Sequence, residues 1–206
     1  ERLGEGHYRA QSIDDALSQR YLDHYIEMLD PSKSYFLTAD IEEFSQWALK
    51  LDDLAKRGDL KPGFEMFNRL RDRAMNQLEK NIVLLENPDY VFDYETEDSV
   101  ILDPDARNWL ESSDAATDYW EKRLKDSMIR LVLNDKDPSE AREILIKRYT
   151  RQIKQYEQRD SQDVFQLYAN ALTALYGPHS SYFTPRNNEN FQINMSLSLE
   201  GIGAQL

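Results

Sequence analysis

Apolar residues recur every three or four positions along most of this chain, in runs separated by proline, glycine and asparagine. This spacing places the apolar side chains on one face of an α-helix. The first run predicts a helix that starts at Ser12, where Asp15 completes a capping-box-like start, and that ends at Asp30-Pro31. Its apolar positions are Ile13, Leu17, Tyr21, Tyr25 and Leu29.

Two further helices are predicted in the first half of the chain. The second follows Asp40 and ends at Gly58. The third opens at Pro62 and ends before Asn87-Pro88. The apolar positions of the second are Ile41, Phe44, Ala48 and Leu51, and those of the third are Phe67, Leu70, Ala74, Leu78, Ile82 and Leu85.

Three more helices are predicted in the second half. One starts at about Asp114, and the next starts at Asp137, which is followed by a proline in the first turn and an acid at the third position. The last runs from Ser161 to a cap at Gly177, after which proline prevents continuation. Their apolar positions are Tyr119, Trp120, Leu124, Met128 and Leu131, then Ala141, Leu145, Tyr149, Ile153 and Tyr156, and then Val164, Tyr168, Ala171, Leu172 and Leu175. The predicted fold class is all-α, an irregular bundle of about six main helices.

Residues 88–103 lack this spacing and form the one stretch where extended structure is favoured. Their β-branched and aromatic residues are Val91, Phe92, Tyr94, Val100 and Ile101. Both a short hairpin and a pinned loop satisfy this pattern.

Charge and composition exclude several classes of function. With 25 basic and 38 acidic residues, the net charge of −13 disfavours nucleic acid or an anionic membrane surface as the main partner. There is no cysteine, which excludes disulfides, thiolate catalysis and cysteine-ligated zinc. The longest apolar run, at residues 82–85, falls far short of the roughly 18 residues of a membrane helix. The first ten residues hold no apolar signal core, so we expect any export signal to be already removed or never present.

Candidate sites in the helical part have simpler structural interpretations. The acidic cluster Asp93, Glu95, Glu97 and Asp98 lacks the EF-hand glycine and final glutamate, so a solvated loop is favoured over a metal site. A basic strip of Arg142, Lys147, Arg151 and Lys154 shares its helix with three glutamates, which favours an ordinary charged outer face. The histidines, His7, His24 and His179, are isolated, and for His179 a hydrogen bond within the turn is favoured over catalysis. No metal or cofactor is expected.

Two segments of the chain echo each other. "LDPSKSYFLTADIEEF" at residues 29–44 resembles "YGPHSSYFTPRNNENF" at residues 176–191: a helix end, proline, small polar residues, Tyr-Phe, and a later Phe. Each Tyr-Phe pair is expected to fold back as an apolar plug, so Tyr182-Phe183 is predicted to fill the helical core after the last helix.

The second of these segments, together with the residues after it, resembles the junction found in carboxy-terminal processing, or tail-specific, proteases. In that family a Pro-His-Ser-Ser-Tyr-like turn and a Phe-containing helix lead into a PDZ domain whose first strand carries Gly-Ile-Gly. Pro178 to Tyr182, Phe191 and residues 198–204, "SLEGIGA", match this pattern in order and spacing. The helical part, including "DPSKSYFLTADIEEF", is similar to the long N-terminal domain of the Gram-negative periplasmic branch.

The resemblance implies that this chain is a piece of a longer periplasmic protease. Residues 1–186 would be the N-terminal helical domain, and residues 187–206 a linker helix and the start of a PDZ domain, with its first strand from about residue 196. A serine nucleophile and a lysine base are then expected beyond Leu206, because a desolvated, neutral lysine can deprotonate serine. Ser180, Ser181, Ser196 and Ser198 belong to the linker pattern, and the chain alone is expected to be inactive.

The resemblance also implies partners. Protein substrates with unstructured, apolar C-termini are expected, with an adaptor lipoprotein as a further partner and membrane association only through partners. The candidate substrate-binding residues are Gly201, Ile202, Gly203 and Ala204, whose exposed backbone N–H groups could receive a terminal carboxylate. The same glycines could instead simply let a first strand bend into its sheet. The alternative function is a free-standing helical interaction domain without enzymatic activity.

Overall fold

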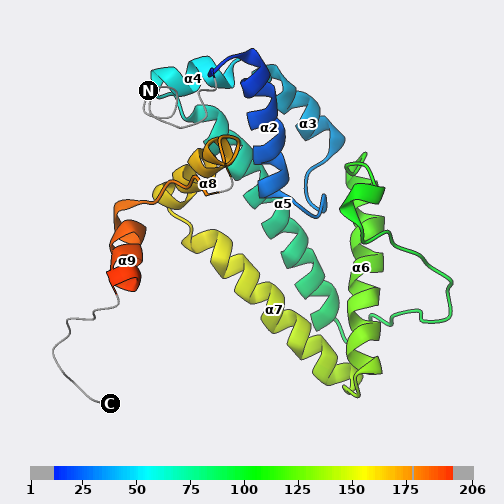
Figure 1. Cartoon of the computed structure of the whole chain (residues 1–206). Helices are drawn as coiled ribbons and strands as arrows, with labels where there is room; N and C mark the ends of the chain where they lie inside the picture. Colours follow the sequence, from blue (N-terminus) through cyan, green and yellow to red (C-terminus); the bar gives the residue numbers. More distant parts are fainter. Residues whose placement is uncertain (1–11, 178, 197–206) are drawn as a thin grey trace, which may run out of the picture.

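The computed structural model describes residues 12–177 and 179–196, which form α-helices, two single 3-10 turns and loops (Figure 1). An all-α fold is therefore confirmed for these residues, with eight helices where about six were expected. They are α2 (Asp15–Leu29), α3 (Thr38–Phe44), α4 (Leu51–Arg57), α5 (Lys61–Glu86), α6 (Ser113–Leu133), α7 (Pro138–Gln158), α8 (Ser161–Ala174) and α9 (Pro185–Ser196). The 3-10 turns are η1 (Ser45–Trp47) and η2 (Pro104–Ala106). The predicted PDZ strand lies mostly outside the described residues. No helix in the described ranges is both long enough and apolar enough to cross a membrane.

The first helix starts two residues later than predicted. Its N-cap is Asp14, whose carboxylate accepts a hydrogen bond from the backbone N–H of Leu17 at 3.0 Å. The hydroxyl of Ser12 donates to this same carboxylate at 2.6 Å instead of capping the helix itself. The predicted end at Asp30 is confirmed, because Asp30 is the C-cap.

The predicted second helix is wrong as a single element. It begins at Thr38, before Asp40, and is divided into α3, η1 and α4. At the break, the Ser45 hydroxyl donates to Glu42 O at 2.6 Å, which gives the last carbonyls of α3 a side-chain partner. The predicted stop at Gly58 is confirmed, since this residue has a left-handed φ of 72°.

The remaining starts agree with the sequence to within a residue. Helix α6 is capped by Ser112, α7 by Asp137 and α8 by Asp160. The end of α8 is different, because the helix stops at Ala174 with Leu175 as its C-cap, so Gly177 is not the cap.

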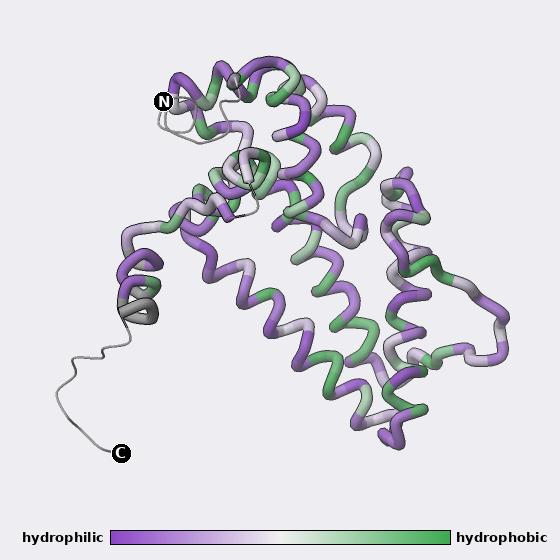
Figure 2. Tube along the Cα trace, in the orientation of Figure 1, coloured by the Kyte–Doolittle hydropathy of each residue, from purple (hydrophilic) through white to green (hydrophobic). Residues whose placement is uncertain are grey.

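Helix α5 organises the packing, because it is long enough to serve two cores. Its 26 residues span roughly 39 Å. Its first half packs with α2, α4 and α8, and its second half packs with α6 and α7. Apolar positions recur at turn spacing along these helices (Figure 2). The two halves are therefore joined by one continuous helix.

Three tyrosines and one glycine join α2, α5 and α8 in the first core. The ring of Tyr168 stacks on Tyr21 and meets Tyr25 edge-on, each at 4.9 Å between centroids. The Tyr25 hydroxyl donates to Gly63 O at 3.0 Å. A Cβ at Gly63 would lie 2.6 Å from Cγ of Tyr168, so only glycine fits at this close approach.

We expect Gly63→Ala to lower the free energy of unfolding by about 1–3 kcal/mol, the usual cost of overpacking a rigid core. Helix propensity alone would favour alanine by roughly 1 kcal/mol, so the sign of the change reports the clash. Urea denaturation measures it, with Glu65→Ala on the same helix as control. A stabilised Gly63→Ala variant would contradict the packing.

Residues 88–103 form a pinned loop, and the hairpin alternative is wrong because no strand forms there. Phe92 is buried in the second core. The Arg142 guanidinium lies over the Phe92 ring and donates to the Leu85 carbonyl at 2.9 Å and to the Tyr90 carbonyl. Lys125 contributes an ion pair with Asp98 at 2.8 Å. Side chains from α6 and α7 thus hold the loop in place, without the backbone hydrogen bonds between strands that a hairpin would have.

Candidate functional site

The Tyr182-Phe183 pair leads from α8 to α9 and is only partly buried. Tyr182 rests edge-on against Phe165 at 5.0 Å, and its backbone N–H donates to Oδ1 of Asn170 at 2.6 Å. Phe183 is 41% exposed and stacks on Phe191 of α9 at 5.2 Å. The prediction that Phe183 plugs the core is therefore wrong. In this extended stretch alternate residues point inward, and the inward positions fall on Tyr182 and the buried Thr184.

The earlier segment, in contrast, buries its phenylalanine completely. Phe36 has no exposed surface and meets Phe44 and Trp109 edge-on at 5.4 and 6.1 Å. In both segments the two phenylalanines stand eight positions apart. The same spacing therefore yields one buried pair and one exposed pair.

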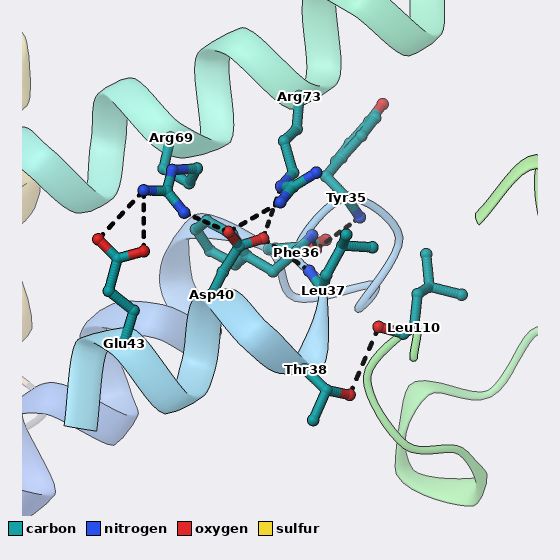
Figure 3. Close-up of polar contacts among 10 residues, drawn as sticks. Tyr35, Phe36, Leu37, Thr38, Asp40, Glu43, Arg69, Arg73 and Leu110 are labelled. Atoms are coloured by element: carbon teal, nitrogen blue, oxygen red, sulfur yellow. Dashed lines mark hydrogen bonds and ion pairs between the residues drawn. The ribbon is translucent and has the colours of Figure 1, made fainter. Parts of the chain in front are cut away.

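A buried carboxylate, Asp40, fixes the earlier segment to α5 (Figure 3). Its side chain is 1% exposed and lies 2.5 Å from Nη1 of Arg69 and 2.5 Å from Nε of Arg73. It also accepts the backbone N–H of Leu37 at 2.9 Å. Arg69 reaches on to Glu43 at 2.9 Å. Burial raises the pKa of Asp40, but the hydrogen bonds from Arg73, Leu37 and Arg69 outweigh it, so the pKa lies below its ordinary value of 3.8.

A second buried carboxylate, Asp30, shapes the loop between α2 and α3. It accepts the backbone N–H groups of Ser34, Tyr35 and Phe36 at 2.9, 2.8 and 3.0 Å. The loop in turn receives α6, because the indole N–H of Trp120 donates to Ser34 O at 2.8 Å. The start of α6 is thereby held against the loop rather than against α5.

Helices α5 and α6 consequently leave a groove between them, which we call the α5/α6 groove. It contains two adjoining hollows with volumes of about 380 and 400 Å³. Both are lined by Asn76, Gln77 and Lys80 of α5 and by Thr117 of α6. The first hollow reaches Arg69 and Arg73, and the second reaches Asn81, Val83 and Leu84.

The comparisons with known proteins bear on the whole of this arrangement. The family model of the tail-specific protease N-terminal domain matches residues 1–186. A tail-specific protease of Haemophilus influenzae is 34% identical over 206 residues, which cover 100% of this chain. This chain belongs to the tail-specific protease family. It spans 29% of the length of that relative.

In this tail-specific protease domain, the titratable groups singled out from the sequence have structural partners or face solvent. His24 lies 3.9 Å from Glu27 on α2, and His179 is exposed in the turn after α8. Asp93 accepts hydrogen bonds from Glu95 N and from Thr96. Across residues 12–177 and 179–196, no group of three or more histidine, aspartate or glutamate side chains is placed to hold a metal.

In the basic strip on α7, three residues face solvent and the fourth, Arg142, has structural partners. Lys147, Arg151 and Lys154 are exposed, as expected for a charged outer face, and Lys147 pairs with Glu143 at 3.4 Å. Arg142 instead points inward to the loop after α5. The substrate-binding residues predicted from the sequence, Gly201, Ile202, Gly203 and Ala204, lie outside the described residues, as does His7.

Sequence reasoning missed both buried carboxylates and the groove. Asp30 precedes Pro-Ser-Lys-Ser, a composition typical of side-chain-stabilised turns, which could have pointed to its role. Asp40 was interpreted as a helix start, whereas it is the third residue of α3 and pairs with arginines 29 and 33 positions away. A pairing between residues so far apart in the sequence cannot be predicted from a local pattern.

Proposed function

We propose that this chain is the N-terminal helical scaffold of a periplasmic tail-specific serine endopeptidase. The scaffold frames the substrate cradle and docks an adaptor lipoprotein, while a PDZ domain and a Ser/Lys catalytic core follow it in the longer protein. The observation that carries the proposal is the similarity along the whole chain to a tail-specific protease more than three times as long.

The electrostatics of the helical part support a scaffold rather than a catalytic unit. A lysine that acts as a base needs a pKa lowered by desolvation. Hydrogen bonds to Asp52 and Asp118 instead raise the pKa values of Lys56 and Lys122. These lysines are held in the charged form, which is the opposite of what the reaction requires.

The exit from the domain also supports a role within a longer protein. Between α8 and α9, the ring of Tyr182 packs against Phe165 of α8. Helix α9 then extends away from the bundle (Figure 1). Phe191 of α9 and Phe183, just before this helix, stack on each other and are both exposed. An exposed aromatic pair favours a contact with another part of the full protein.

A chimera tests this proposal. We expect the present chain alone to leave an unfolded protein with an apolar C-terminus uncleaved, because it would contain no Ser/Lys dyad. Grafted in place of the matching segment of the Haemophilus influenzae protease, it should sustain tail-dependent cleavage, whereas deletion of that segment should abolish it. Gel electrophoresis of the products measures both.

The control uses the same substrate with an amidated C-terminus, which should be cut more slowly if a carboxylate is recognised. We propose that Gly201, Ile202, Gly203 and Ala204 supply the N–H groups for that carboxylate, so Gly203→Val in the chimera should remove the preference for the free terminus. Cleavage by the isolated chain, lost on mutation of one of its own serines, would overturn the assignment.

A further inference from the structure

The α5/α6 groove contains an unsatisfied amide. Asn81 is 1% exposed and lines the second hollow. Its Oδ1 accepts a hydrogen bond from Nε2 of Gln77 at 3.0 Å, but its buried Nδ2 has no hydrogen-bond partner. Buried amide donors in native proteins nearly always find a partner, so this group points to one that enters the groove.

The neighbouring side chains supply further hydrogen-bonding groups of the same kind. Asn76 and Gln77 line both hollows beside Lys80, which has no ion-pair partner among the described residues. Each carboxamide carries both donors and an acceptor, which is also what a peptide group offers. A row of carboxamides along one helix therefore matches a polypeptide main chain.

The remaining lining and the length of the groove fit the same occupant. Val83 and Leu84 border one end, and Leu37 and Trp120 border the other, so apolar side chains of a bound segment would have a surface at both ends. From Arg69 to Leu84 the helix rises roughly 22 Å, which accommodates six or seven residues of extended chain at about 3.3 Å each.

We propose that the α5/α6 groove binds an extended polypeptide segment through its main chain, with Gln77 and Asn81 as the central hydrogen-bonding residues. A free anion fits less well for two reasons. Arg69 and Arg73 are already paired with Asp40, and the second hollow is lined by two glutamates, Glu79 and Glu121. The proposal goes beyond the scaffold role and is independent of the Gly-Ile-Gly motif, since it requires no terminal carboxylate.

Fluorescence anisotropy tests it with an N-acetylated, C-amidated eight-residue peptide of alternating Thr and Val, labelled on one added lysine. We expect the 206-residue chain to bind this peptide. The double change Gln77→Leu and Asn81→Leu should weaken binding at least about tenfold, the loss expected when one or two net hydrogen bonds disappear.

A blocking variant separates the groove from other surfaces. Thr117→Trp places a large ring at an exposed position shared by both hollows and should weaken binding by a similar factor, while leaving the amides intact. The control is Leu133→Trp, at an exposed and equally uncharged position of α6 outside the groove, which should bind as the wild type. Circular dichroism confirms that each variant is folded.

Absence of binding by the wild-type chain would overturn the proposal, as would unchanged binding by folded Thr117→Trp. In the second case the peptide would occupy another surface. A failure of the chimera experiment, by contrast, would leave this result unaffected, because the amidated peptide and the isolated chain involve neither a protease core nor a tail site.

Discussion

Phe36→Ala should lower the free energy of unfolding by about 3–5 kcal/mol, the usual cost of truncating a fully buried aromatic ring. Phe36 has no exposed surface, and its ring meets Phe44 of α3 and Trp109 of the loop before α6. The truncation would leave a cavity where the loop after α2, helix α3 and the segment before α6 come together. Urea denaturation followed by circular dichroism measures the loss.

Phe183→Ala is the matched control, because Phe183 has the same position in the similar segment at residues 176–191 as Phe36 has in residues 29–44. Its ring is exposed and loses only the stack on Phe191, so we expect a loss of about 1 kcal/mol or less. Equal losses for the two variants would contradict the difference in burial between the two copies.

The two copies show what local sequence can and cannot predict. Both have the Tyr-Phe pair and the later phenylalanine, and in both a helix does follow, α3 in one case and α9 in the other. Whether the phenylalanine is buried depends on distant residues such as Trp109, which no pattern within the segment records.

The five long helices α2, α5, α6, α7 and α8 were predictable, because each buries an apolar stripe read directly from its spacing. The starts of α7 and α8 follow from caps at Asp137 and Asp160 and their neighbours. The division of the second predicted helix into α3, η1 and α4 could not be predicted, since it depends on side-chain hydrogen bonds such as that from the Ser45 hydroxyl to the Glu42 carbonyl. Such side-chain hydrogen bonds compete with the backbone hydrogen bonds of a helix, but they do not change the spacing of apolar residues from which the helix was predicted.

The groove was hidden for a related reason. Its α5 residues Asn76, Gln77 and Lys80 have the composition of a solvated outer face, and Asn81 is a single polar residue on an otherwise apolar stripe. Only the placement of α6, which Trp120 and the loop after α2 determine together, turns that face into one wall of a groove.

Asp40→Asn should destabilise the protein by about 3 kcal/mol near neutral pH, at the lower end of the cost of breaking a buried ion pair. The substitution keeps the size of the side chain and an acceptor for the N–H of Leu37, but removes the charge that Arg69 and Arg73 share. The lower end applies because the two arginines remain 36% and 31% exposed and can recover some hydration. Asp53→Asn, at an exposed residue paired with Lys56 at 3.6 Å, is the control and should change stability by less than about 0.5 kcal/mol.

The pH dependence identifies the charge as the cause. Because the folded-state pKa of Asp40 lies below its ordinary value of 3.8, the unfolded chain takes up this proton first as the pH falls. The stabilisation by the carboxylate is therefore complete above 3.8 and is lost as the pH falls through the folded-state pKa. Unfolding free energies measured across this range should show the gap between wild type and Asp40→Asn closing toward acid, with the wild type losing stability more steeply. A gap that stayed constant would mean that the substitution acts through packing or capping, and that Asp40 does not stabilise α3 against α5 by its charge.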